Sequence, residues 1–258
     1  MDDTLWAIVE PILREAYPSK PTGRPRVDFR QVFNAVLFRL RSGCQWNRMP
    51  AELGSDSSNH RWFQRWREDG VWEKVWATLV ERCDELGGVE WDWQAADAML
   101  GKGPLWGGDV GPNPTDRAKN GTKKSLLVDG QGGPLAAMTS PANWHDSKCL
   151  EDLLHMVVVE RPDSTERLCL DKGYDTPAAR RVAEEFGYEP RIEPIQRPGN
   201  PKPRRRKNRR WVVERTFAWL SKCRGLLVRN EKHAENYLAL FQLGCLLLWY
   251  RRLRQLTG

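Results

Sequence analysis

The sequence predicts an α/β protein in which an all-helical N-terminal module precedes a mixed β-sheet covered by helices. Three observations predict this class. The first 87 residues show helical hydrophobic periodicity and end at a glycine pair, Gly87 and Gly88. Strand-like and helix-like segments then alternate in the order β-β-β-α-β-α-β-α, which is typical of a layered α/β domain. Because 258 residues suffice for two domains, we expect them at 1–87 and 88–258.

The N-terminal module begins with two amphipathic segments. Apolar residues recur at helical spacing over residues 5–12 and again over 29–40, which predicts one helix in each place. Asp28 precedes the second segment and is placed to cap it, and Gly43 is placed to end it. This second segment carries the clearest helical pattern in the chain.

The next segment resembles a helix-turn-helix. Residues 49–53 and 59–69 are separated by a turn at 54–58, and residues 71–86 add a closing helix. In helix-turn-helix proteins the second helix enters the major groove of DNA. We expect its polar residues Arg61, Gln64 and Arg65 to contact DNA. The alternative is an ordinary pair of core helices.

The second half begins with strand signals. Residues 89–100 predict a first strand, and residues 123–140 predict a hairpin that turns at 129–133. The remaining elements follow in chain order: a helix at 147–158, a strand at 167–171, a helix at 176–187, a strand at 188–195, a helix at 209–220 and a buried helix at 237–250. The zone between residues 99 and 120 predicts a long functional loop.

One carboxylate, Glu214, lies among arginines in the helix predicted at residues 209–220. Val213, Phe217 and Leu220 form the core-facing stripe of this helix, and Glu214 falls at its edge. A partly desolvated carboxylate there should be paired, protonated or bound to a metal. The simplest interpretation is an ion pair with Arg210 or its neighbour, unless other carboxylates converge on the same place.

Two aspartates meet that condition. Asp97 interrupts the first strand, where aspartate is a poor strand former, and Asp171 ends a later strand. Three carboxylates gathered at one end of a sheet repel each other unless a cation lies between them, and carboxylate oxygens suit Mg²⁺ or Mn²⁺. Two such ions about 4 Å apart support phosphodiester displacement. Asp92 and Asp129 are the rival candidates for the role given to Asp97.

The charge distribution favours a polyanionic partner. The chain has 41 Lys and Arg residues against 34 Asp and Glu, a formal charge of +7. Residues 197–210 hold eight basic residues and no acidic one, directly before the Glu214 helix. Such a basic loop suggests contact with phosphate backbone. The residues expected to touch DNA backbone here and in the long loop are Arg117, Lys119, Lys123, Lys124, Arg204, Arg205, Arg206 and Lys207.

Other classes of function find no support in the sequence. The six cysteines show no CxxC pair or nearby histidine cluster, so we expect reduced thiols, no zinc site and a cytoplasmic protein. No phosphate-binding glycine motif predicts a nucleotide cofactor. The apolar stretch at residues 237–250 is too short to span a membrane, and no secretory signal is seen.

Several blocks together resemble a known family, the bacterial insertion-sequence transposases of the DDE type, within the insertion sequence 5 family. The blocks occur in the family's order over roughly residues 5–248: "GRPRVDFRQVFNAVLFRLRSGCQWNRMP", "GPNPTDRAKNGTKKSLLVDGQGGPL", "ANWHDS", "LDKGYDT" and "RRWVVERTFAWLSKCRGLLVRNE". The resemblance implies an RNase H-like catalytic domain behind a helical DNA-binding region. By position it implies that Asp97, Asp171 and Glu214 are the catalytic, metal-binding residues.

The resemblance also implies an activity and partners. Such an enzyme binds double-stranded DNA at its element's terminal repeats, cleaves it with Mg²⁺ or Mn²⁺, and joins the 3′ hydroxyls to target DNA, as a dimer or larger assembly at the bacterial nucleoid. Arg210 matches an arginine of the family's glutamate helix, which implies a contact with phosphate of the DNA or with a carboxylate. Ser221 stands where a lysine is usual, and Lys222, which follows it, is the candidate DNA contact there.

Some roles and two rival functions stay open. His145 and Asp146 are candidates to line the site, although Asp146 is equally placed to cap the next helix. Trp106 or Trp144 is a candidate to stack on a flipped base. The rival functions are a catalytically silent DNA-binding regulator and an RNase H-like nuclease without strand transfer.

Overall fold

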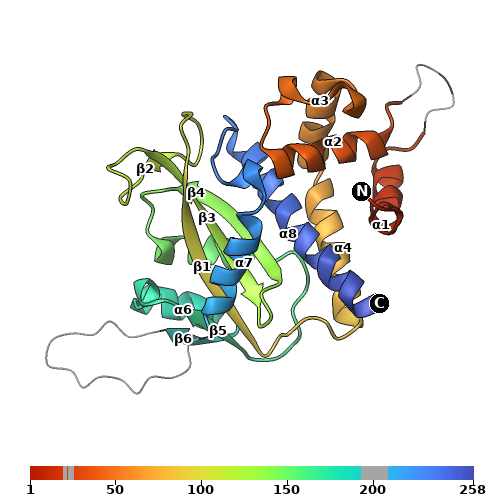
Figure 1. The fold of residues 1–258 in the computed structure, drawn as a ribbon. Helices are drawn as coiled ribbons and strands as arrows, with labels where there is room; N and C mark the ends of the chain where they lie inside the picture. The colour runs from red at the N-terminus through yellow and green to blue at the C-terminus, as the bar shows by residue number, and fades with distance from the viewer. Residues whose placement is uncertain (20–21, 23–25, 193–208) are drawn as a thin grey trace, which may run out of the picture.

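The N-terminal helices and a mixed β-sheet form two regions of the fold, and the last helix of the chain runs between them (Figure 1). The computed structural model describes residues 1–19, 22, 26–192 and 209–258. The helix predicted at 209–220 therefore lies inside the described part. Most of the basic loop before it, including Arg204, Arg205, Arg206 and Lys207, lies outside the described residues.

Four α-helices build the N-terminal region. They are α1 (Asp3–Ala16), α2 (Phe29–Ser42), α3 (Asp56–Glu68) and α4 (Val71–Glu85), with 3₁₀ turns at η1 (Trp46–Arg48) and η2 (Ala51–Leu53). The predicted caps of α2 are confirmed: Asp28 accepts a hydrogen bond from the N–H of Arg30, and Gly43 adopts φ 69°. The helix expected at residues 49–53 is only the η2 turn, so the helix-turn-helix prediction holds for α3 but not for its partner.

The described residues form a sheet of six strands. They are β1 (Trp93–Lys102), β2 (Gly111–Pro112), β3 (Asn120–Asp129), β4 (Pro134–Pro141), β5 (Glu166–Leu170) and β6 (Tyr188–Ile192). The order across the sheet is β4-β3-β1-β5-β6, with β2 also paired to β3. β1, β3 and β4 run antiparallel, whereas β5 and β6 run parallel to β1. The sheet is mixed, as predicted, and only the short β2 was not expected.

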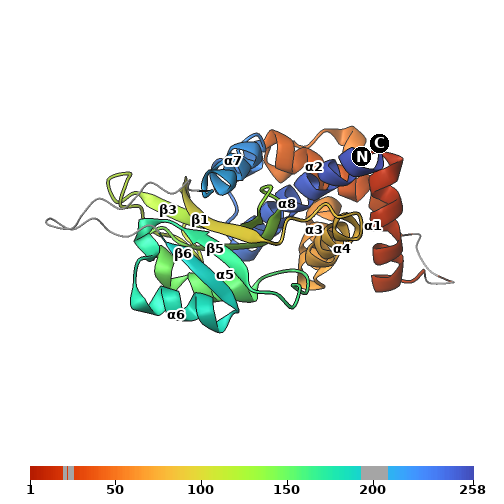
Figure 2. The same cartoon turned by 90° about the horizontal axis from the view of Figure 1, so that it is seen from below.

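Helices cover both faces of the sheet. Figure 2 shows α5 (Leu150–His155) and α6 (Pro177–Glu185) on one face and α7 (Trp211–Leu220) on the other. α7 packs against β1 and β3 through the buried residues Val212, Val213, Thr216, Phe217 and Leu220. This packing holds α7 on the face to which Asp97 points.

The last helix, α8 (Ala234–Thr257), lies alongside α4 and also packs on β4 (Figure 1). Polar contacts tie its region to the N-terminal helices: Gln242 Nε2 donates to Glu73 Oε1 over 2.8 Å, and the buried Arg39 pairs with Glu231 over 2.9 Å. Hydrophobic burial is continuous through both regions. None of the helices in the described residues is both long enough and apolar enough to cross a bilayer.

Candidate active site

Asp97 and Asp171 lie level with each other on neighbouring strands. The parallel pairing of β1 with β5 matches Gln94 to Leu168 and Ala95 to Cys169. Continued by two residues, the same register places Asp97 beside Asp171, which directly follows the last residue of β5. Neighbouring strands are about 4.8 Å apart, so the two aspartates belong to one cluster. The sequence prediction that these residues meet at one end of the sheet agrees with this register.

Asp171 is held in place by the turn that follows it. Its Oδ1 accepts a hydrogen bond from the backbone N–H of Gly173 over 2.7 Å and so caps the 3₁₀ turn η4 (Lys172–Tyr174). One carboxylate oxygen is therefore committed to the backbone. The second oxygen has no such contact with the backbone in this turn.

Glu214 reaches the cluster through Arg210. One guanidinium nitrogen of Arg210, Nη1, donates to Asp97 Oδ2, and the other, Nη2, forms an ion pair with Glu214 Oε1 over 2.7 Å. The side chain of Asp97 is 16% exposed and that of Glu214 is 54% exposed. Both interpretations of Glu214 are thus present together: it pairs with Arg210 one turn earlier, and that pair stands at the carboxylate cluster.

The electrostatics of the cluster follow from burial and proximity. Burial raises the pKa of Asp97; the backbone N–H of Ala98 and the Arg210 guanidinium oppose this rise, and Asp171 adds to it. Burial alone would lower the pKa of Arg210, but Asp97 and Glu214 raise it above its ordinary value. Arg210 therefore stays charged and supplies the positive charge that the carboxylates require.

The donor chemistry of the cluster fits a hard divalent cation, because all three candidate ligands are carboxylates. Within the described residues, no three or more His, Cys, Asp or Glu side chains are already arranged to hold a metal ion. The guanidinium of Arg210 pairs with both Asp97 and Glu214. It therefore competes with a cation for these two carboxylates.

Tyr174 and a second ion pair lie next to the cluster. Tyr174 is buried in the 3₁₀ turn that follows Asp171. Burial raises the pKa of Tyr174, and the negative charges of Asp146, Asp97 and Asp171 raise it further. Asp146 pairs with Lys123. Sequence reasoning missed Tyr174, although its position three residues after Asp171 was the available signal.

Lys123 and Lys124 differ from their expected role as DNA contacts. Both lie in β3 between β1 and β4 and are buried. The ammonium of Lys123 donates to Asp146 and to the carbonyl of Trp144, and that of Lys124 donates to the carbonyl of Leu226 over 2.7 Å. Burial lowers the pKa of Lys124 to about 8. These lysines are satisfied inside the protein.

The alternative role of Asp146 as a helix cap is wrong. His145 caps the 3₁₀ turn η3 (Asp146–Lys148), because its side chain accepts from the N–H of Ser147, and Cys149 occupies the N-cap position of α5. Asp146 instead binds Lys123 beside the carboxylate cluster.

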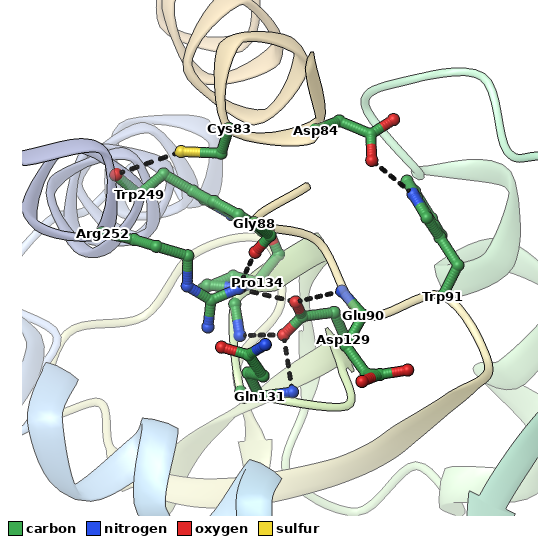
Figure 3. A network of polar contacts seen from close by, with 12 residues as sticks. Cys83, Asp84, Gly88, Glu90, Trp91, Asp129, Gln131, Pro134, Trp249 and Arg252 are labelled. Atoms are coloured by element: carbon green, nitrogen blue, oxygen red, sulfur yellow. Dashed lines mark hydrogen bonds and ion pairs between the residues drawn. The ribbon is translucent and has the colours of Figure 1, made fainter. Parts of the chain in front are cut away.

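The two rivals of Asp97 lie elsewhere. Asp92 is exposed before β1. Asp129 is fully buried at the β3–β4 turn, where it accepts hydrogen bonds from the backbone N–H groups of Glu90, Gln131 and Gly133 and pairs with Arg252 over 2.6 Å (Figure 3). Its role is to hold this turn.

The other predicted DNA contacts are spread over the surface. Arg61 and Arg65 are exposed on α3, and Gln64 is half-buried there. The guanidinium of Arg65 also stacks on Tyr17 and Trp62, 5.2 and 5.3 Å from the ring centres. Of the contacts predicted outside α3, Arg117, Lys119 and Lys222 are exposed. The two candidate stacking residues, Trp106 and Trp144, are exposed as well.

The chain is similar to known proteins over most of its length. Residues 77–249 match the family model described as a transposase DDE domain, and residues 1–76 match a model described as a putative transposase of the IS4/5 family. A putative transposase for the insertion sequence element IS402 of Burkholderia cepacia is 37% identical over 159 residues, which are 57% of this chain and 71% of that protein.

A second relative comes from the same element. An uncharacterized 16.2 kDa protein of IS402 from Burkholderia cepacia is 30% identical over 102 residues, covering 38% of this chain and 69% of that protein. No solved structure matches the chain.

Proposed function

The chain belongs to the insertion-sequence transposases with a DDE domain, and from this premise we propose that it binds the terminal inverted repeats of its element, cleaves them by phosphodiester hydrolysis and joins the 3′ hydroxyls to target DNA. The observation that carries the proposal is the register that sets Asp97 beside Asp171, with Glu214 linked to the same place by Arg210. The RNase H-like fold predicted from the resemblance is confirmed by the DDE domain and its mixed sheet.

The DDE domain implies that the enzyme uses a divalent metal. We propose Mg²⁺ or Mn²⁺, as two ions, with Asp97, Asp171 and Glu214 as the ligands. When bound there, the ions activate the attacking oxygen and stabilise the leaving oxygen of the phosphodiester displacement. Asp171 is the best prepared of the three, because the turn that follows it fixes its side chain through the backbone N–H of Gly173.

Arg210 has a defined part in this proposal. In the structure it neutralises Asp97 and Glu214, so that the carboxylates tolerate each other. If Arg210 releases Asp97, its guanidinium remains next to the carboxylate cluster, where the phosphate that reacts must bind. Guanidinium groups bind phosphate through paired hydrogen bonds. Arg210 then contacts the DNA backbone at the reacting position.

The DNA is proposed to extend over both halves of the chain. Residues 1–87 form the helical DNA-binding region, in which Arg61, Gln64 and Arg65 of α3 face the duplex. Around the catalytic region the proposed backbone contacts are the exposed residues Arg117, Lys119 and Lys222 and the basic residues Arg204, Arg205, Arg206 and Lys207. Because two element ends must be joined in one reaction, we propose a dimer or larger assembly on DNA.

A strand-transfer assay tests the proposed function. We expect the wild-type protein to bind labelled DNA that carries the terminal repeats from the flanking sequence, and to convert it to joined product in Mg²⁺ or Mn²⁺ but not with a chelator. Cleavage without joined product would favour the nuclease alternative. Binding of the repeats with no reaction in either metal would favour the regulator, and absence of repeat-specific binding would reject the proposal.

A further inference from the structure

A groove rich in arginine and tryptophan lies along the side of α7 next to the side that carries Glu214. It has a volume of about 580 Å³ and lies between α7, the β3–β4 turn and the end of α8. Its wall residues on α7 are Trp211, Arg215 and Trp219, and α8 contributes Arg251 and Arg252. None of the described residues that line it is acidic, so they present positive charge beside apolar surface.

The α7 wall is built as a stack. Trp211, Arg215 and Trp219 follow each other at one-turn spacing on one side of the helix. The guanidinium of Arg215 lies 4.6 Å from the ring centre of Trp211 and 4.7 Å from that of Trp219. Arg215 also donates to the carbonyl of Gln131 in the β3–β4 turn. The two indoles and the guanidinium are thereby ordered, although Trp211 remains 54% exposed.

The two arginines of α8 differ in their availability. Arg252 pairs with the buried Asp129 and stacks on Trp249, so its positive charge is neutralised inside the fold (Figure 3). Arg251, one residue earlier, is exposed. Glycines at positions 130, 132 and 133 line the floor, and a Cβ at Gly132 or Gly133 would meet side-chain atoms at 2.8 Å or less. The turn therefore brings bare backbone to the groove.

We propose that this groove binds an unpaired stretch of DNA strand next to the reacting end, with a base stacked on the exposed face of Trp211 and a phosphate on Arg251. Indole faces and arginines along a concave surface are the features by which proteins hold single strands without reading sequence. A duplex backbone alone would need the charge but not the aromatic wall. The proposal rests on the proposed function for its substrate, DNA.

Position along α7 connects the groove to the reaction. Arg210 and Glu214 at the carboxylate cluster are each followed in sequence by a groove residue, Trp211 and Arg215. The two sites thus lie on adjacent sides of a helix that is about 10–12 Å across, a distance that a short stretch of DNA strand can span. A strand that leaves the catalytic carboxylates can reach the groove without passing through the protein.

The test measures equilibrium binding without chemistry. A fluorescent 12-nucleotide oligothymidylate is titrated with the full chain in a chelator, with a blunt duplex of equal length as the comparison. We expect Trp211→Ala to weaken oligothymidylate binding about tenfold and Trp211→Phe to keep it, because stacking on a single base gives an effect of that order. Arg251→Ala should lower the salt slope of binding by about 0.7, the value for one phosphate of a single strand.

Controls separate the outcomes. Arg254→Ala, also on α8 but outside the groove lining, should change neither affinity nor slope. The proposal is overturned if wild-type protein does not bind the oligothymidylate, if Trp211→Ala binds it like wild type, or if duplex affinity falls equally. Dissociation of a self-assembled species by Trp211→Ala, with unchanged DNA affinity, would identify the groove as an interface between copies instead. Because no metal is present, loss of catalysis does not affect this result.

Discussion

Replacement of Asp171 by Asn is expected to lower cleavage and joining of element ends by about a thousandfold while repeat binding is kept. Asn keeps the Oδ1 acceptor that Gly173 binds, so the turn η4 should persist. The lost charge removes a metal ligand, and metal stabilisation of the transition state amounts to several kcal/mol. Each 1.36 kcal/mol corresponds to about tenfold in rate, which gives the expected size. Single-turnover cleavage on labelled ends measures it.

Asp92→Asn is the matched control for this experiment. Asp92 is an aspartate close to the start of β1, but it is exposed and stands before the strand that carries Asp97. The Asp92 variant should cleave and join like wild type. Full activity of Asp171→Asn, or an equal loss in Asp92→Asn, would contradict the assignment of Asp171 to the catalytic cluster.

Removal of the Asp129 carboxylate is expected to give the largest loss of stability. Asp129 is fully buried and accepts four hydrogen bonds, three from backbone N–H groups and one from Arg252. Asp129→Ala leaves those donors and a largely buried guanidinium without their acceptor. Loss of one partner from a buried ion pair costs about 3–5 kcal/mol. Thermal melting should shift downward by about 10 °C, at about 2–4 °C per kcal/mol for a chain of this size.

Asp84→Ala provides the comparison for stability. The exposed carboxylate of Asp84 accepts one hydrogen bond from Trp91 Nε1 over 2.8 Å, close to the Asp129 network (Figure 3). Its removal should cost less than about 1 kcal/mol, as is usual for an exposed polar contact. Equal melting temperatures for the Asp129 and Asp84 variants would show that the buried network does not stabilise the fold as described.

Local signals in the sequence were sufficient for most elements of the fold. The cap at Asp28, the stop at Gly43 and the turn between β3 and β4 are short-range features, and each is where the sequence predicts it. Asp171 is likewise found where the sequence predicts it, at the end of a strand, whereas Asp97 lies inside β1 and its assignment depends on the family resemblance. The β1–β5 register then places Asp97 beside Asp171, a relation that follows once the two strands are adjacent and parallel.

Contacts between distant segments were beyond the same reasoning. Arg210 and Asp97 are separated by 113 residues, so the sequence offered only the local pair of Arg210 with Glu214. Lys123 and Lys124 look like surface residues in the sequence, because no local signal shows that β3 is flanked by a strand on both sides. The acceptors of their ammonium groups, Asp146 and the carbonyl of Leu226, also lie far away in the sequence. The groove on α7 likewise needs α8, which begins only at Ala234, after α7 has ended at Leu220.

Binding of Mn²⁺, followed by loss of the free-ion electron paramagnetic resonance signal, tests the central claim that Asp97, Asp171 and Glu214 hold the catalytic metal. The titration is done on the full chain with element-end DNA, and the uptake by DNA alone is subtracted. Wild type should bind Mn²⁺, and Asp171→Asn and Glu214→Gln should lose most of that uptake. Arg210→Ala should bind at least as tightly as wild type, because the guanidinium that competes for Asp97 and Glu214 is gone. Equal uptake by wild type and Asp171→Asn, or no uptake by wild type, would contradict the claim.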